Sequence, residues 1–202
     1  MIDKFLFILI FLISISSCQT KSTEKHDLDK AIDAAAMSKN AKDPLFLGFD
    51  FSMDSIATLS KISELEESGK LKYSSDGNLR YNFDLGVTAY NTAIGLTYDN
   101  DTLSSINIVF FNENGFTIDL IKNQVAANIT STFSEKGYTS YIDGSIPENT
   151  DYYWIKNNVI VSIKSYKSFV ILSYKNAIIE KKNKIKDELD KNERKEQTLS
   201  DI

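Results

Sequence analysis

The stretch Ile106-Asn107-Ile108-Val109-Phe110-Phe111 decides the fold that we expect for this chain. Successive side chains of a β-strand point to opposite faces, so Ile106, Ile108 and Phe110 share one face. The other face receives Asn107 and two further apolar side chains. A strand with large apolar side chains on both faces is typical of the middle of a sheet. The pattern therefore predicts a central strand that is buried on much of both faces.

The residues before this strand predict its antiparallel neighbour. Residues 87–98 alternate in their second half, which places Ile94, Leu96 and Tyr98 on one face of a strand. Asn100-Asp101 then supplies the turn into the central strand.

A hairpin and a helix come earlier in the same half of the chain. Asp76-Gly77 lies between predicted strands at 71–74 and 79–83, and this dipeptide is a strong hairpin signal. We expect Ser52 to cap a preceding helix, with Asp54 in the first turn, where the helix dipole favours a negative charge.

The second half of the chain repeats this order. A helix over residues 118–135 has an apolar side chain every fourth residue, and a glycine follows it, as one follows the first helix. Asn157-Asn158 is expected to form a tight turn within the strands that come next. These strands are predicted at 138–142, 152–156, 159–164 and 169–174.

The two halves together indicate an α+β fold. Each half runs helix, glycine, then about four antiparallel strands, so we predict one or more antiparallel sheets with helices packed on one face. The repeated order indicates a tandem α-β-β-β-β arrangement, by divergent duplication or by coincidence. The globular domain is assigned to residues 45–175, with halves 45–112 and 113–175.

This layout resembles that of β-lactamase-inhibitor-type and related small envelope domains. The resemblance covers residues 45–175 and consists of element order alone. No inhibitor contact residue can be matched, so the family's function stays an analogy. No specific domain family is recognised in the sequence.

Polar segments flank the domain on both sides. Residues 18–44 indicate a polar tether with a short amphipathic helix, whose apolar face begins at Leu28 and ends at Ala36. Residues 176–202 are rich in Lys, Glu and Asp and predict a charged helical or disordered tail. A partner-binding or coiled-coil arm is the alternative, although the apolar line is short for a coiled coil.

The first residues resemble the signal of a bacterial (Bacteroidota-like) lipoprotein. Lys4 precedes an apolar run too short to span a bilayer, and Ile15-Ser16-Ser17-Cys18 matches the lipobox pattern. The resemblance implies that residues 1–17 are a signal peptide and that Cys18 is lipidated and becomes the first mature residue. An ordinary secretory signal or an uncleaved anchor is the alternative.

The residues after Cys18 bear on localisation. Gln19 is not Asp, which by resemblance to Gram-negative sorting leaves the protein free to reach the outer membrane. Surface-exported lipoproteins of Bacteroidota usually carry clustered acids here, whereas residues 19–25 hold one acid and two lysines. We therefore expect a membrane as partner through lipidated Cys18, at the outer membrane, with the periplasmic face favoured over the cell surface.

Composition excludes several classes of function. The net charge of −5 argues against nucleic-acid binding. His26 is the only histidine and Cys18 the only cysteine, so a multi-histidine metal site, a histidine triad and a disulfide are excluded within one chain. Asp99-Asn100-Asp101 begins like an EF-hand loop, but Ser104 and Phe110 stand where Gly and Glu are required. We predict no cofactor and no metal.

Tyr152 and Trp154 are the candidate ligand or partner surface. In a strand they share one face, while Tyr153 and Ile155 take the other. An exposed Tyr/Trp row could stack on a sugar or anchor a protein. The alternative is that both rows pack beneath a helix or a loop.

The remaining chemistry favours a function without catalysis. Scattered acids could in principle supply a carboxylate pair for hydrolysis, but no spacing singles out two of them. We therefore predict no catalytic residues and expect a non-enzymatic protein-binding or structural module of the cell envelope, with an envelope protein or polysaccharide as partner. Glycan or small-ligand binding by the aromatic row is the alternative, and a carboxylate-based hydrolase is less favoured. The candidate acids are Asp84, Asp119, Asp143 and Asp151.

Overall fold

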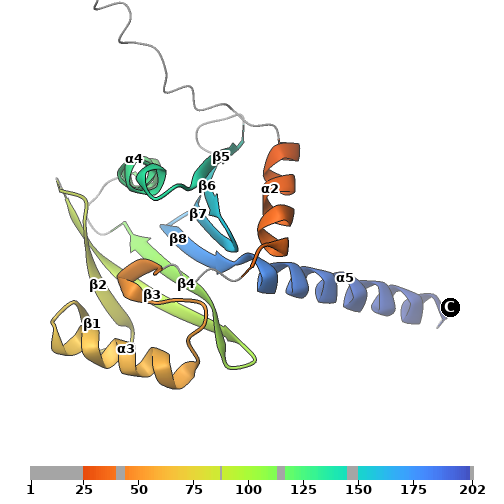
Figure 1. Cartoon of the computed structure of the whole chain (residues 1–202), viewed down its shortest axis with the longest axis horizontal. Helices are drawn as coiled ribbons and strands as arrows, with labels where there is room; N and C mark the ends of the chain where they lie inside the picture. Colours follow the sequence, from red (N-terminus) through yellow and green to blue (C-terminus); the bar gives the residue numbers. More distant parts are fainter. Residues whose placement is uncertain (1–24, 40–43, 87, 113–116, 145–149, 201–202) are drawn as a thin grey trace, which may run out of the picture.

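The computed structural model describes residues 25–39, 44–86, 88–112, 117–144 and 150–200. Within these residues the chain forms one β-sheet with α-helices against it, and α5 projects away from the body (Figure 1). The helices are α2 (Lys25–Met37), the short 3-10 helix η1 (Phe46–Gly48), α3 (Ser55–Glu67), α4 (Ile118–Glu135) and α5 (Ala177–Ser200).

The described strands form one antiparallel sheet in the order β1-β2-β3-β4-β8-β7-β6-β5. Each half of the chain contributes a meander of four strands, and the two meanders meet where β4 pairs with β8. The predicted α+β class, with helices against an antiparallel sheet, is confirmed. The strands are β1 (Leu71–Tyr73), β2 (Leu79–Asp84), β3 (Ala89–Asp99), β4 (Thr102–Phe111), β5 (Thr139–Asp143), β6 (Asp151–Lys156), β7 (Val159–Ser165) and β8 (Phe169–Asn176).

β4 lies at the centre of the sheet, as its alternation predicts. Ile106, Ile108 and Phe110 are fully buried and face the main core. The other face of β4, which carries Asn107 and Val109, is only partly buried. The reason is that α2 covers this face over β5, β6 and β7 but not over β4.

The main core lies between the first face of the sheet and helices α3 and α4. α3 contributes Ile62 and Leu65, and α4 contributes a stripe that begins at Ile121 and ends at Phe133. Burial of such apolar surface is the main favourable term in folding, at about 25 cal/mol per Å². The helix predicted over residues 118–135 has the same bounds as α4.

The N-cap of α3 differs from the prediction. Asp54, and not Ser52, caps this helix, because its carboxylate accepts a hydrogen bond from the N–H of Ala57 at 2.7 Å. The N–H of Leu103 donates to the carbonyl of Met53 at 2.8 Å. That bond pairs Met53 with the start of β4. The residues up to Met53 are therefore not helical, and α3 begins after Asp54.

A β-bulge interrupts the pairing of β3 with β4. Ile94 and Leu96 face the core as predicted, and the bulge follows Thr97, where Ser104 of β4 is the additional residue. Tyr98, at the end of β3 beyond the bulge, is 39% exposed.

α2 packs on the opposite face of the sheet from α3 and α4, whereas the prediction placed the helices on one face. Its predicted apolar face is confirmed, because Leu28 and Ala35 are buried in a cluster with Tyr153 and Ile160. The folded unit therefore includes residues 25–37, which the prediction placed in a tether outside the domain. An amphipathic pattern shows that a helix has a partner surface but not which surface it is.

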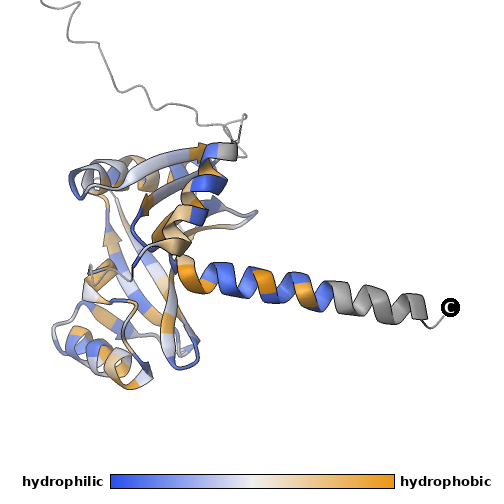
Figure 2. Cartoon of the chain, turned by 45° about the vertical axis from the view of Figure 1, so that its right-hand side comes forward, coloured by the Kyte–Doolittle hydropathy of each residue, from blue (hydrophilic) through white to orange (hydrophobic). Residues whose placement is uncertain are grey.

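α5 continues directly from β8, and its helical form confirms the predicted charged C-terminal helix. An ion pair at 3.0 Å between Lys181 and Asp33 joins its base to α2. Farther out, short hydrophobic bands interrupt an otherwise hydrophilic helix (Figure 2), and Ile185 is half exposed. Among the described residues, no helix has the length and apolar character needed to cross a membrane.

Candidate functional site

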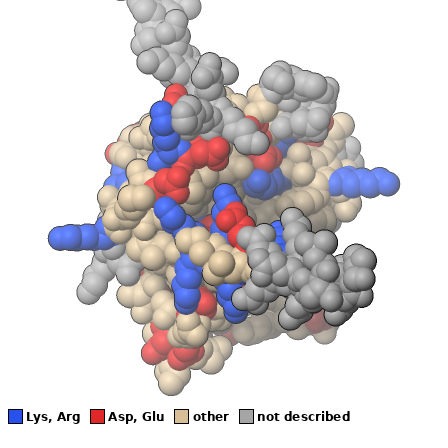
Figure 3. Space-filling model, turned by 90° about the vertical axis from the view of Figure 1, so that its right-hand side faces the viewer, with Lys and Arg blue, Asp and Glu red and all other residues tan. Residues whose placement is uncertain are grey.

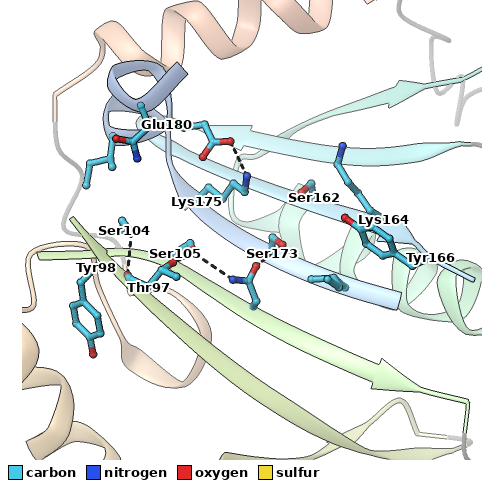
Figure 4. Close-up of a pocket in the computed structure, with 14 residues that line it drawn as sticks. Thr97, Tyr98, Ser104, Ser105, Ser162, Lys164, Tyr166, Ser173, Lys175 and Glu180 are labelled. Carbon is cyan, nitrogen blue, oxygen red and sulfur yellow. Dashed lines mark hydrogen bonds and ion pairs between the residues drawn. The ribbon is translucent and has the colours of Figure 1, made fainter. Parts of the chain in front are cut away.

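One part of the second face of the sheet is left uncovered. Whereas α2 packs over β5, β6 and β7, a groove of about 510 Å³ remains over β3, β4 and β8. Its floor comes from these strands and from β7, and the first turns of α5 form one side (Figure 4). Both halves of the chain therefore build the groove, across the seam between β4 and β8.

The floor is a row of small polar side chains on neighbouring strands. The hydroxyl of Ser173 donates to Asn107 Oδ1 at 2.7 Å, and Asn107 Nδ2 donates to the hydroxyl of Ser105 at 3.3 Å. The hydroxyls of Ser105 and Thr97 share a further hydrogen bond. Ser162 lies directly opposite Ser173 on β7 and extends the row. These hydrogen bonds let polar side chains occupy the centre of a sheet without a covering helix.

The two ends of the groove differ. One end contains Tyr98, beside the first turns of α5, and an ion pair at 3.0 Å joins Lys182 of α5 to Asp99. The other end contains Lys164 and Tyr166 (Figure 4). Tyr98 and Tyr166 are 39% and 48% exposed, and the ring of Tyr98 points away from the floor of the groove (Figure 4).

Both lysines of the groove are paired with acids. Lys175 Nζ lies 2.6 Å from a carboxylate oxygen of Glu180, and Lys164 Nζ lies 3.0 Å from one of Asp151. Burial lowers the pKa of Lys164, but its hydrogen bonds with Tyr153 and Asp151 outweigh burial and hold the pKa above its ordinary value. The groove is therefore polar and contains charges that are largely compensated.

Tyr152 and Trp154, the predicted ligand surface, do not form an exposed row. Trp154 is 1% exposed beneath α4, and the ring of Tyr152 stacks beside it with centroids 6.3 Å apart. The hydroxyl of Tyr152 donates to Asn123 of α4 at 3.3 Å. On the other face of β6, Tyr153 is buried in the cluster formed with α2. Both aromatic rows are core because helices cover both faces of the sheet at β6.

The four candidate acids do not assemble into one site. Asp143 and Asp151 lie directly opposite each other in β5 and β6, but Asp151 is paired with a lysine. Asp119 is on α4, where it lies 3.5 Å from a different lysine. Asp84 ends β2, where it accepts a backbone N–H at 2.7 Å. Asp143 and Asp151 are the one pair of these acids that lie opposite each other, and Lys164 neutralises Asp151.

The turn between β3 and β4 forms as predicted. Asn100 and Asp101 have φ values of 47° and 63°, a left-handed conformation that Asn and Asp tolerate in tight hairpin turns. In the part of the chain that the structure describes, no three His, Cys, Asp or Glu side chains gather into a potential metal site.

The sequence prediction missed the groove, although one signal was present. Asn107 interrupts an otherwise apolar strand, and Ser162 and Ser173 do the same in β7 and β8. Small polar residues in strands that are otherwise apolar indicate a region without a covering helix. The sequence does not show that these polar residues lie side by side, because Asn107 and Ser173 are 66 positions apart.

The lipobox pattern and Cys18 lie outside the described residues, so lipidation stays a prediction. The layout resemblance to β-lactamase-inhibitor-type domains consists of element order alone. As expected from a sequence in which no specific domain family is recognised, comparisons with family models, with curated proteins and with solved structures found no match to this chain.

Proposed function

We propose that this protein is a lipid-anchored binding module of the cell envelope, without catalytic activity, that engages an envelope partner through the groove on its sheet. The lipobox pattern at residues 15–18 supports the anchor, with Cys18 as the lipidated residue. The uncovered groove supports the binding role. Labelling with palmitate that is lost in Cys18→Ala tests the anchor, and labelling that persists in this variant would overturn it.

A single observation carries the binding role: small polar side chains form the floor on the central strands. The face of a central strand that lies under a helix normally carries apolar residues. Here Asn107 and Ser173 hydrogen-bond each other at 2.7 Å, so this face is stable while it stays open. Because the side chains are short, a partner can approach the sheet closely over Gly95, which lies opposite Asn107.

The charges around the groove favour a partner that is recognised by hydrogen bonds and shape. Both groove lysines are paired with acids of this chain. Acidic and basic side chains are also interspersed on the face from which α5 projects (Figure 3). A field of one sign, which would select partners by charge, is therefore not a feature of this face. A polar segment of another envelope protein has the matching chemistry.

The experiment fills the groove without changing the core. Asn107→Trp places a large ring over the groove, where Gly95 on the neighbouring strand leaves space. Ser60→Trp is the matched control, because Ser60 is exposed on α3, on the other face of the sheet. Envelope proteins that cross-link to the wild-type chain in host cells should be lost with Asn107→Trp and kept with Ser60→Trp. The same partners with both folded variants would overturn the proposal.

A glycan is the second candidate for the same groove, on a specific observation. The hydroxyl and amide groups of the floor are the donors and acceptors that sugar hydroxyls pair with. Tyr166, at one end and 48% exposed, presents an accessible ring of the kind that the buried Trp154 lacks. Retention on envelope polysaccharide of the host that is lost with Asn107→Trp would assign the groove to a glycan. Retention that is unchanged in this variant would exclude it.

A further inference from the structure

A second hollow, of about 470 Å³, lies at the edge of the sheet where β1 is the outermost strand (Figure 1). The strand residues that line it alternate with residues of the main core, so their side chains are on the face that also carries the groove. We call it the basic hollow. Its polar lining comes from Lys70, Lys72, Arg80, Asn82 and Asn91.

The backbone brings the three cations of the basic hollow together. Gly69 follows α3 with a φ of 71°, the left-handed region that favours glycine. The N–H of Lys70 donates to the carbonyl of Leu65 at 2.9 Å, which fixes where β1 begins. Lys72 then lies directly opposite Arg80 of β2. The cations therefore gather because of the helix end and the strand register.

Arg80 is the cation that is held in place. Its Nη2 donates to Asp76 at 3.0 Å, and its Nε donates to the hydroxyl of Ser74 at 3.3 Å. The guanidinium group also lies over the ring of Phe111, 5.5 Å from the ring centroid. Among the described residues, none accepts a hydrogen bond from Nη1 of this side chain. Nη1 therefore keeps two N–H donors for a ligand.

Lys70 and Lys72 supply the net charge of the basic hollow. Asp76 offsets the charge of Arg80, whereas both lysines are exposed and neither forms an ion pair within the described residues. None of the described residues that line the hollow is acidic. A phosphate monoester carries about −1.5 to −2 charges near pH 7 and offers three acceptor oxygens. It matches two lysines beside an arginine fork, whereas a carboxylate would leave one lysine without a counter-charge.

Two amide side chains extend the basic hollow beyond its cations. Asn82 and Asn91 lie directly opposite each other in β2 and β3, and both are exposed. Their amide groups form no hydrogen bond with other described residues. An amide offers both donors and an acceptor, which pair with sugar hydroxyls. The hollow is also larger than a phosphate group alone would fill, so we expect the phosphate to carry a hydroxylated group.

We propose that the basic hollow binds a phosphorylated saccharide. The phosphate lies between Lys70 and Lys72 and accepts hydrogen bonds from Nη1 of Arg80, and the sugar hydroxyls pair with Asn82 and Asn91. A neutral sugar would leave the lysines without a counter-charge, and inorganic phosphate would leave the amides unused. This site is separate from the groove and does not depend on the groove's function.

Three probes and matched variants test the site by isothermal titration calorimetry on the purified full-length protein. We expect saturable binding of glucose 6-phosphate, weaker binding of methyl phosphate and no binding of glucose. Lys72→Gln should weaken both phosphate probes by about three- to ten-fold. The matched control is Lys184→Gln, at an exposed position of α5, which should weaken neither. Asn91→Ala should weaken glucose 6-phosphate by about three-fold and leave methyl phosphate unchanged.

The contrary outcomes are equally specific. Absence of saturable binding of glucose 6-phosphate to the wild-type protein would overturn the site, as would equal weakening by Lys72→Gln and Lys184→Gln. Loss of binding in Asn107→Trp would place the probe in the groove instead. Tighter binding of glucuronate would assign the hollow to a carboxylate, and displacement of the probe by phosphatidylglycerol vesicles would assign it to a lipid headgroup. Lys72 and Asn91 are exposed, so their variants should melt like the wild type, and Lys70→Gln gives a further folded variant.

Discussion

Asp54 begins α3 by capping its first turn. Its carboxylate accepts the N–H of Ala57 at 2.7 Å, which satisfies a group that the start of a helix leaves without an intrahelical partner. Asp54→Ala should lower the free energy of unfolding by about 1 kcal/mol, measured by urea denaturation. The control is Ser52→Ala at an exposed position outside the cap, where we expect a change below about 0.5 kcal/mol. A larger loss in Ser52→Ala than in Asp54→Ala would contradict the assignment.

Asp76 makes the hairpin between β1 and β2 sensitive to acid. Its carboxylate accepts hydrogen bonds from the hydroxyl of Ser74, from the N–H of Asn78 at 3.2 Å and from Arg80 at 3.0 Å. The bond from Ser74, followed by those from Asn78, holds the pKa of Asp76 well below its ordinary value.

This depressed pKa sets the direction of a pH effect. Because the folded-state pKa lies below the unfolded value of about 3.9, the stabilisation is fully present above that value and is lost as the pH falls toward the folded-state pKa. Asp76→Asn should therefore lower the thermal midpoint at neutral pH. The difference from the wild type should shrink as the pH falls from about 7 to about 2. A difference that stays constant over this range would contradict the assignment.

At the scale of elements, α2 is held by one apolar face, which packs against the sheet. Ala35 is buried against the sheet, while the neighbouring Ala34 is exposed. Ala35→Glu would bury a charge without a partner and should lower the free energy of unfolding by at least about 2 kcal/mol. Ala34→Glu is the matched control and should change it by less than about 0.5 kcal/mol.

The same pair of variants also separates undocking from global unfolding. Limited proteolysis of Ala35→Glu should cut within α2 first, because the undocked helix has little intrinsic stability. The control Ala34→Glu should resist cleavage as the wild type does. Equal resistance of both variants would show that α2 does not depend on its contact with the sheet.

Most of the helices and strands that the sequence predicts correctly are predicted from local periodicity. The alternation around Ile108 predicts a central strand, and the spacing of apolar residues in α4 predicts its bounds, because each pattern depends only on neighbours in sequence. The cap of α3 could not be predicted in this way. The bond from Leu103 to the carbonyl of Met53, which moves the start of α3, joins residues that are distant in the chain.

The candidate site was predicted less well than the fold, for a related reason. Alternation in β6 shows that Tyr152 and Trp154 share a face, and this is correct. It does not show which faces of the sheet receive helices, so the sequence favoured these rings over the open row at Asn107 and Ser173. That choice depends on where α2 and α4 dock, which is a property of the tertiary structure.

At the scale of the whole molecule, the two halves share one pair of strands. β4 and β8 pair over seven residues, and Ile108 lies opposite Leu172, with both side chains fully buried. The main core crosses this seam on one face, and the groove crosses it on the other. Neither half contains a complete core or a complete groove, so both depend on the seam.

We therefore predict that neither half folds alone. A chain ending at residue 112 would expose β4 as a long edge strand with an apolar face, and a chain beginning at residue 113 would expose β8 in the same way. Each fragment should lack a cooperative thermal transition. Mixing the two after dilution from denaturant should restore one, together with a blue shift in the emission of Trp154, the only tryptophan. A cooperative transition in either isolated fragment would contradict this prediction. Residues 45–112 and 113–175 would then be independent domains whose sheets are joined only where β4 pairs with β8.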